Sequence, residues 1–150
     1  MEEAIRLGRL GMQNNEGGPF GCVIVKDDKI IGRGWNRVVG DKDPTAHAEV
    51  TAIRDACKNL QAFQLDGCEV YTSCEPCPMC MGAIYWARPA KVYFAASRND
   101  AAAAGFDDSM IYEELSAPVE QRNIRMERIV PEKAVLLFNE WITKEDKTAY

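Results

Sequence analysis

The sequence is organised around Pro44-Thr45-Ala46-His47-Ala48-Glu49 and, further along, Glu75-Pro76-Cys77-Pro78-Met79-Cys80. Together the two stretches supply one imidazole, two thiols three residues apart and one carboxylate. A threonine in the first stretch and prolines in the second are typical of the start of a helix. We therefore expect each stretch to open a helix and the two helix starts to share one metal ion.

The chemistry of the donors favours zinc, with one Zn2+ held by His47, Cys77 and Cys80. Residues three apart on a helix share a face, so the two cysteines can bind the same ion. A helix N-terminus also stabilises the thiolate form that binds metals. His47 is the only histidine in the chain. Three protein ligands leave a fourth position for water, as in catalytic zinc sites.

Cys74 offers an alternative, because Cys74 and Cys77 have the same spacing. Cys74, however, is expected at the end of the preceding strand, before Pro76, where it would not share a helical face with Cys77. A structural zinc site of Cys74, Cys77, Cys80 and His47 would be closed to water. Three buried thiols without a metal are a further alternative. The remaining cysteines are scattered in apolar surroundings and are expected in the core: Cys22, Cys57 and Cys68.

Glu49 follows His47 by two residues and is the candidate catalytic residue. A glutamate in the first turn of a helix can simply be a surface residue that the helix dipole favours. Beside zinc its role would differ, because zinc lowers the pKa of a bound water from about 15.7 to about 7. The released proton then needs a carrier, and a carboxylate within reach can serve.

The rest of the chain predicts an α/β fold. Its hydrophobic pattern indicates helices over 2–14, 46–60 and 131–144, with a further helix opened by the cysteine segment, and shorter apolar segments over 101–104 and 110–115. Strands are expected over 21–25 and 29–39, joined at Asp27-Asp28 as a hairpin, over 68–72 and 91–96, and as a short fifth strand over 124–130. A hairpin followed by alternating strands and helices predicts three α/β/α layers around a mixed sheet of about five strands.

Length and charge limit the classes of protein to consider. A chain of 150 residues has the size of one domain, so we expect residues 1–150 to form a single catalytic domain. A formal net charge of −5 argues against affinity based on many phosphate contacts. No apolar run approaches a membrane span, and Met1-Glu2-Glu3 lacks the basic flank of a signal peptide. We therefore expect a cytoplasmic protein whose six cysteines remain thiols.

The two stretches match the H-x-E…P-C-x-x-C signature of zinc-dependent nucleobase deaminases. The chain resembles the cytidine-deaminase-like superfamily and, more closely, the bacterial guanine deaminases of that fold. The zinc motif marks the superfamily, whereas Gly105-Phe106-Asp107-Asp108 and the terminal Tyr150 resemble the guanine branch. The likeness covers nearly the whole chain and is carried by 17–21, Asn36, 43–54, 72–80, 82–88, 104–108 and Tyr150.

This resemblance implies a hydrolase that acts on the C–N bond of a cyclic amidine, converting guanine to xanthine and ammonia in purine metabolism. Water activated by zinc would attack C2, and Glu49 would carry the proton. The residues that would contact the base are Phe20, Asn36, Ala48, Trp86, Asp108 and Tyr150. The resemblance also implies a homodimer, with exchange of the C-terminal segment so that Tyr150 closes the pocket.

Side-chain chemistry agrees with part of this assignment. Guanine presents an N1–H donor, which suits the carboxylate of Asp108, and the acceptors O6 and N7, which suit the amide of Asn36. Each residue also has a plain structural interpretation. Asp107-Asp108 can cap the next helix, Asn36 can be a turn residue, and Phe20 and Trp86 can be core residues.

Three rival functions remain open from the sequence. A tRNA adenosine deaminase shares the zinc motif, but it must hold an RNA loop, and the acidic balance of this chain argues against that. Deamination of guanosine or cytosine differs only in the shape of the pocket. A zinc-stabilised binding module would keep the metal and have no catalysis.

Overall fold

The computed structural model describes residues 1–149. They divide into two compact units, Met1–Ser109 and Met110–Tyr150. The first unit contains α1 (Glu2–Gln13), β1 (Gly21–Lys26), β2 (Lys29–Trp35), α2 (Val38–Asp41), α3 (Ala48–Leu60), β3 (Glu69–Cys74), α4 (Pro78–Ala87), β4 (Lys91–Ala96) and α5 (Arg98–Ala103). The helix α6 (Ser109–Ser116) leads into the second unit, which also contains a 3-10 turn (Val119–Gln121) and α7 (Pro131–Thr143).

The sheet of the first unit has four strands in the order β2-β1-β3-β4. Strand β1 is antiparallel to β2 and β3, whereas β4 runs parallel to β3, so the sheet is mixed as predicted. The predicted hairpin is also confirmed. Asp27 and Asp28 both have positive φ, 48° and 60°, as a two-residue turn of the favoured hand requires.

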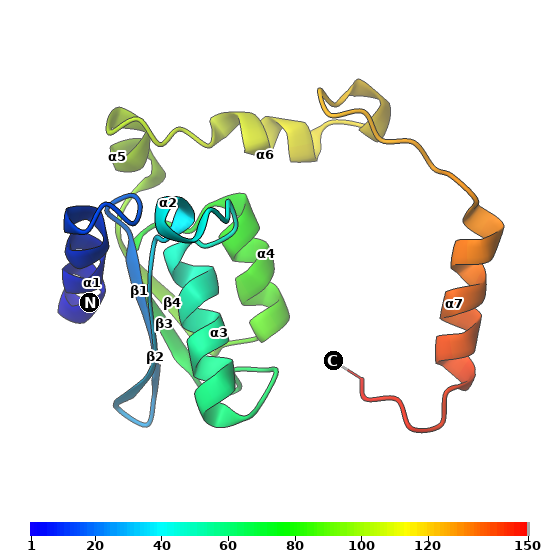
Figure 1. The fold of residues 1–150 in the computed structure, drawn as a ribbon, viewed down its shortest axis with the longest axis horizontal. Helices are drawn as coiled ribbons and strands as arrows, with labels where there is room; N and C mark the ends of the chain where they lie inside the picture. The colour runs from blue at the N-terminus through cyan, green and yellow to red at the C-terminus, as the bar shows by residue number, and fades with distance from the viewer. Residues whose placement is uncertain (150) are drawn as a thin grey trace. The chain divides into compact units, whose positions relative to one another are not determined.

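Helices cover both faces of this sheet, with α1 on one side and α3 and α4 on the other (Figure 1). Strand alternation explains the arrangement, because successive residues point to opposite faces. A Cβ at Gly21 would lie 2.0 Å from the carbonyl oxygen of Ala4 on α1. A Cβ at Gly34, which pairs with Cys22 next to Gly21, would instead meet Ala48 on α3. The expected three-layer α/β/α class is confirmed, with four strands in the sheet.

The packing of α3 against β2 is unusually close. A Cβ at Gly34 would lie 2.2 Å from the Ala48 carbonyl oxygen, and one at Gly32 would lie 2.6 Å from the Ala56 side chain. Small residues on both elements therefore bring the helix backbone close to the strand. The core around this contact consists of Cys22, Ile24, Ala48, Ala52, Ala56, Leu65, Cys68, Val70 and Ala87.

Two elements differ from the sequence prediction. Strand β2 ends at Trp35 rather than at 39, and α2 occupies Val38–Asp41. The side chain of Asn36 causes the change, because its Oδ1 accepts hydrogen bonds from Gly18 N and Val38 N, both at 3.3 Å, and turns the chain. Residues 124–130 also form no strand. A strand needs a hydrogen-bonded neighbour, and no strand of the described chain pairs with them.

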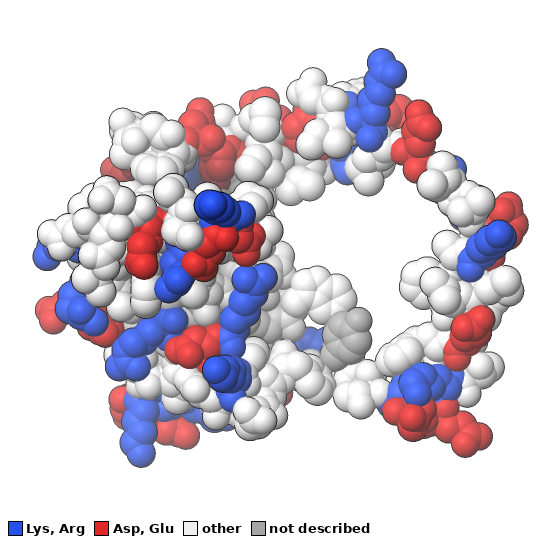
Figure 2. Space-filling view, in the orientation of Figure 1, with Lys and Arg blue, Asp and Glu red and all other residues white. Residues whose placement is uncertain are grey.

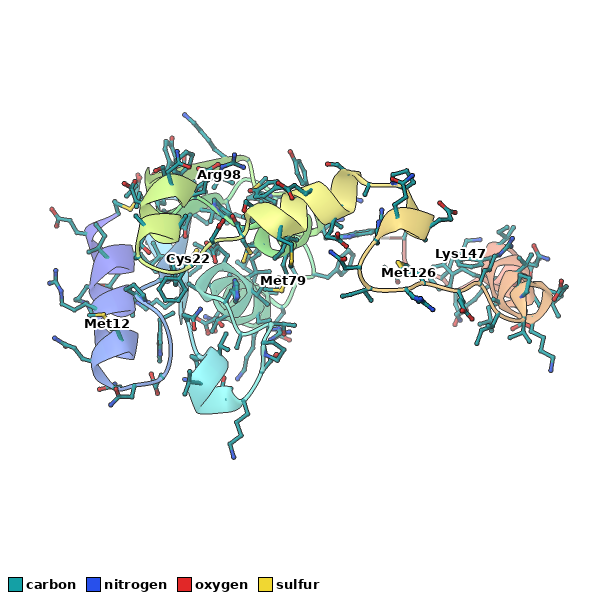
Figure 3. All side chains as sticks on the ribbon, turned by 90° about the horizontal axis from the view of Figure 1, so that it is seen from above. Met12, Cys22, Met79, Arg98, Met126 and Lys147 are labelled. Carbon is teal, nitrogen blue, oxygen red and sulfur yellow. The ribbon has the colours of Figure 1, made fainter. Side chains whose placement is uncertain are left out.

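In the second unit, none of residues 110–149 is buried. Its local structure is held by hydrogen bonds: the Glu114 carboxylate accepts from the backbone N and the Nδ2 of Asn123, both at 2.8 Å. Arg122 Nε donates to the carbonyl oxygen of Ala117 at 3.1 Å and closes the turn after α6. Side chains project from α7 in all directions (Figure 3). Within residues 1–149, no helix has both the length and the apolar character needed to cross a membrane.

The close packing of α3 gives a direct stability test. Gly34→Ala should lower the free energy of unfolding by roughly 1–3 kcal/mol, because the added methyl group overlaps the Ala48 carbonyl oxygen and forces α3 outward. Gly82→Ala is the matched control. No atom lies within 4 Å of its added Cβ, and removing a glycine from the interior of α4 should stabilise by about 0.5–1 kcal/mol. Urea unfolding of both variants measures the difference, and equal midpoints would contradict the packing.

Candidate metal centre and active site

The predicted ligands lie at the starts of two helices. His47 is the N-cap residue of α3 and Cys77 the N-cap residue of α4, each with extended backbone angles. Pro78 follows as the first residue of α4, where its missing N–H is tolerated. Cys80 comes one turn into the same helix and directly follows Met79, which is labelled in Figure 3. Neither N-cap side chain is used to cap its own helix, so both are available for a ligand.

The three donor atoms are brought together, all within 4.8 Å of one another. His47 Nδ1 lies 3.5 Å from the sulfur of Cys77 and 3.5 Å from the sulfur of Cys80. Zinc bonds of about 2.3 Å to sulfur and about 2.0–2.1 Å to nitrogen, at tetrahedral angles, separate such ligands by about 3.6 Å. Donor type and spacing therefore both fit a zinc ion.

The electrostatics of the two thiols differ. Hydrogen bonding from Cys80, followed by that from His47, lowers the pKa of the Cys77 thiol to about 4. Cys80 holds the remaining proton, so its pKa is raised, first by the hydrogen bond to Cys77 and then by burial. The hydrogen bond to Cys77 also raises the pKa of His47. The site thus stabilises one thiolate before any metal binds.

Glu49 lies beside this cluster and is buried, with 6% of its surface exposed. Its Oε2 accepts a contact from the Cys80 sulfur at 3.3 Å, on the side of the predicted ligands. Its Oε1 accepts a hydrogen bond from the Thr72 hydroxyl at 2.7 Å. The carboxylate therefore has one oxygen directed toward the metal site and the other held by the sheet.

Cys74 does not join the cluster. Its sulfur contacts the backbone oxygen of Ser97 at 3.6 Å, and the metal-binding group found among the described residues consists of His47, Cys77 and Cys80. A three-ligand site with an open position is therefore favoured over the closed four-ligand alternative. Two of the remaining cysteines, Cys22 and Cys68, are buried as expected, and Cys57 is half-buried.

Asn36 is buried and holds the loop before β1. Its backbone N donates to the Phe20 carbonyl oxygen at 2.9 Å, and its Oδ1 accepts from Gly18 and Val38 as described above. Gly17 is required here, because a Cβ at that position would lie 2.1 Å from Asn36 Oδ1. The turn interpretation of Asn36 is thus correct, and it is compatible with a binding role for the other end of the amide.

Phe20 forms an edge-to-face contact with Phe106, with ring centroids 4.9 Å apart. This contact joins the loop before β1 to the Gly105-Phe106-Asp107-Asp108 segment. A pocket of about 130 Å³ opens beside the two rings. Its lining is largely apolar and consists of Pro19, Phe20, Ser73, Cys74, Ala96, Asp100, Ala101, Ala104 and Phe106.

The two neighbouring aspartates have different surroundings. Asp107 Oδ1 accepts from the backbone N of Ser109 at 2.9 Å, so Asp107 takes the helix-capping role. Asp108 is half-buried, and burial followed by the negative charge of Cys77 raises the pKa of its carboxyl group. Ala48, the first residue of α3, is fully buried between His47 and Glu49.

The structure does not place Trp86 beside the cluster of metal ligands. It follows Cys80 by six residues on α4, about 9 Å along the helix axis, and 65% of its surface is exposed. Its predicted contact with the base therefore stays a prediction. Tyr150 lies outside the described residues, and its predicted role is likewise untested.

Sequence reasoning missed Thr72 and Phe106. Residues 70, 72 and 74 form the buried row of β3, and a threonine in an otherwise apolar row signals a partner for its hydroxyl. The partner itself could not be identified, because Glu49 lies 23 residues away in the chain. From the sequence, Phe106 is known only as part of the Gly105-Phe106-Asp107-Asp108 segment that resembles the guanine branch.

Comparison with known proteins agrees with this geometry. Residues 1–96 match the family described as the cytidine and deoxycytidylate deaminase zinc-binding region. The whole chain is 53% identical over 150 residues to guanine deaminase from Bacillus subtilis (strain 168), covering 100% of this chain and 96% of that protein. The chain belongs to this deaminase family, in its guanine deaminase branch. An X-ray structure of the Bacillus subtilis enzyme superposes with a TM-score of 0.96 at 54% identity, over 99% of this chain and 95% of that one.

Two further relatives help to define the branch. A solved structure in complex with 8-azaguanine is 36% identical, with a TM-score of 0.68, over 72% of this chain and 62% of that one. A tRNA-specific adenosine deaminase from Aquifex aeolicus (strain VF5) is 43% identical over 96 residues, covering 64% of this chain and 63% of that protein. The similarity to the tRNA enzyme thus covers the metal chemistry, whereas that to the guanine enzyme covers the full length.

Zinc content distinguishes the ligand cysteine from its neighbour. Cys77→Ser should weaken zinc binding by more than about 100-fold, because a hydroxyl replaces a thiolate ligand. Cys74→Ser makes the same chemical change three residues earlier and should retain about one zinc per chain. Metal analysis after dialysis against a weak chelator measures both variants. Equal zinc loss from the two would instead favour the closed site of three cysteines and one histidine that includes Cys74.

Proposed function

We propose that this protein is a zinc-dependent guanine deaminase, which hydrolyses guanine to xanthine and ammonia. The observation that carries the proposal is the His47, Cys77 and Cys80 cluster beside the buried carboxylate of Glu49, within a chain that matches a guanine deaminase over its full length. A binding module would have no need of a buried acid directed at the metal site. The proposal also treats residues 1–150 as one catalytic domain that acts in the cytoplasm.

His47, Cys77 and Cys80 would hold the zinc. When bound, the ion lowers the pKa of a water molecule to near neutrality, so that water can attack C2 of the base at physiological pH. Glu49 then acts through Oε2, which faces the ligands: it takes the proton from the attacking water and delivers it to ring nitrogen N3. The carboxylate would then take the remaining proton from the hydroxyl added at C2 and pass it to the 2-amino group, so that the C2–N bond breaks, ammonia leaves and the C2 carbonyl of xanthine forms.

Recognition of the base is assigned to residues around this carboxylate. Oδ1 of Asn36 is occupied by backbone N–H groups, which leaves Nδ2 to donate to O6 or N7. Asp108, whose carboxyl group is half-buried, can accept from N1–H. Ala48 is the first residue of α3, so its N–H has no acceptor within the helix and can donate to the base. Phe20, held by Phe106, supplies an apolar wall.

A tRNA substrate is less well supported. RNA binding requires a concentration of basic residues, but the net charge is −5. Figure 2 shows acidic and basic side chains interspersed over the visible face. The similarity to two tRNA-specific adenosine deaminases covers 64% and 76% of this chain, whereas that to guanine deaminase covers 100%. Guanosine and cytosine remain as competing small substrates, and assays with each base alone decide between them.

Replacement of the proton carrier tests the catalytic assignment. Glu49→Gln should lower kcat for guanine by about 10²–10⁴-fold, because an amide cannot shuttle a proton, and should retain zinc. Ammonia release and xanthine formation are measured with guanine, guanosine, cytosine, adenine and tRNA side by side. Glu69→Gln, an acid-to-amide change at the far end of β3, is the control and should keep wild-type turnover. An active Glu49→Gln variant would refute the proton-carrier role, and a wild type inactive on guanine would refute the function.

We further propose that the enzyme is a homodimer, in which the C-terminal segment of one chain reaches the site of the other so that Tyr150 closes the pocket. Apolar residues without cover support this proposal. On α7 the exposed large apolar residues are Val135, Leu136, Leu137, Phe138, Trp141 and Ile142. In the first unit, Tyr85 on α4 is 75% exposed, and β4 forms an edge of the sheet. Apolar surfaces of this extent are typical of interfaces between chains.

The oligomeric state provides the test of the dimer. Sedimentation of the full chain should give twice the 16.8 kDa mass of one chain at micromolar concentration. Leu137→Lys combined with Phe138→Lys should raise the dissociation constant at least about tenfold, since charged groups would enter an apolar interface. Glu140→Lys changes an exposed polar position of the same helix and should leave the dimer intact. A monomer at every concentration would exclude the proposal.

A further inference from the structure

We propose that Thr72 is a positioning residue that fixes which oxygen of Glu49 carries the proton. This inference rests on the proposed deaminase function of the site. Thr72 lies in the middle of β3, paired with Cys22 on β1 and Phe94 on β4, so its backbone is held on both sides. Its side chain is fully buried, and its hydroxyl reaches Glu49 Oε1 at 2.7 Å.

In this hydrogen bond Thr72 is the donor and Glu49 the acceptor. An ionised carboxylate can only accept, so the Thr72 hydroxyl donates to Oε1. The other oxygen, Oε2, lies 3.3 Å from the Cys80 sulfur, next to the metal ligands. The two oxygens of Glu49 are therefore not equivalent: Oε2 lies beside the metal ligands, and Oε1 is bonded to Thr72 in the sheet.

The contact with Thr72 becomes more important when the metal binds. In the structure, the hydrogen bonds described for the Glu49 carboxylate come from Thr72 and Cys80. A cysteine that binds zinc is a thiolate and has no proton to donate. Of these two donors, only Thr72 then remains to orient the carboxylate.

A fixed donor at Oε1 also determines where a transferred proton resides. Thr72 occupies one lone pair of Oε1 and holds that oxygen toward β3, whereas Oε2 lies beside the metal ligands, so Glu49 takes up and releases the proton at Oε2. The same oxygen can then serve the attacking water, N3 and the leaving amino group without rotation of the side chain. Misplacement of a catalytic group by about 1 Å can cost about 100-fold in rate.

A pair of substitutions separates the hydroxyl from the volume of the side chain. Thr72→Val keeps the shape and removes the donor, and we expect kcat for guanine to fall roughly 10- to 100-fold while KM changes less than about threefold. Thr72→Ser keeps the donor and should restore kcat to within about threefold of wild type. Tyr71→Phe removes the neighbouring hydroxyl, which bonds Glu69 on the opposite face of β3, and should leave kcat unchanged.

Two readouts do not depend on turnover. Zinc content and the unfolding temperature should be similar in Thr72→Val and Thr72→Ser, whereas crystal structures should show the Glu49 carboxylate rotated in Thr72→Val only. Wild-type kcat in Thr72→Val, an equal loss in both variants, zinc loss from Thr72→Val or an unmoved carboxylate would each overturn the inference. If the wild type fails to deaminate guanine, the proposed function fails, and the crystal structures still decide whether Thr72 positions Glu49.

Discussion

The contact between α3 and β2 is the constraint on which the site depends. The contact is made by glycines at 32 and 34 and alanines at 48, 52 and 56. No room is left for larger side chains, so the distance between α3 and the sheet is fixed. Because His47 and Glu49 lie at the start of this helix, that distance determines where the imidazole and the carboxylate meet the cysteines of α4 and the threonine of β3. The packing of small residues that take no part in the reaction thus sets the geometry of the site.

The site divides its tasks among elements of different kinds. Helix starts supply the predicted metal ligands: the side chains of His47 and Cys77 do not cap their own helices, and the helix dipole stabilises a thiolate. The central strand β3 supplies a rigid hydroxyl behind the proton carrier. Loops supply the residues assigned to the base, Asn36 before α2 and Asp108 before α6. The predicted metal ligands and Glu49 thus lie at helix starts, whereas two of the residues proposed to contact the base lie in loops.

The metal ligands and Glu49 could be predicted from the sequence because all four lie within short motifs whose spacing is set by local helix geometry. The hairpin at Asp27-Asp28 and the α/β class were predicted for the same reason. Thr72 could not be assigned, because its role depends on a partner 23 residues away across two layers. Local patterns also extended β2 to residue 39, beyond its end at Trp35, and predicted a strand over 124–130. In the first case a hydrogen bond donated by the Val38 backbone N to the side chain of Asn36 outweighed β propensity, and in the second the described chain offers no neighbouring strand.

The position of Asp108 in the chain has an evolutionary consequence. The match to the wider deaminase family ends at residue 96, after the ligands and Glu49, whereas Asp108 and the phenylalanine that supports Phe20 come later. The residues assigned to the base are therefore divided along the chain: Phe20, Asn36 and Ala48 lie within the matched region together with the metal ligands and Glu49, and Asp108 and Phe106 follow it. Such an order lets recombination or drift in the later part generate enzymes for new bases while the inherited catalyst stays intact. A family that acts on tRNA adenosine in one branch and on a free purine in another is what this arrangement would produce.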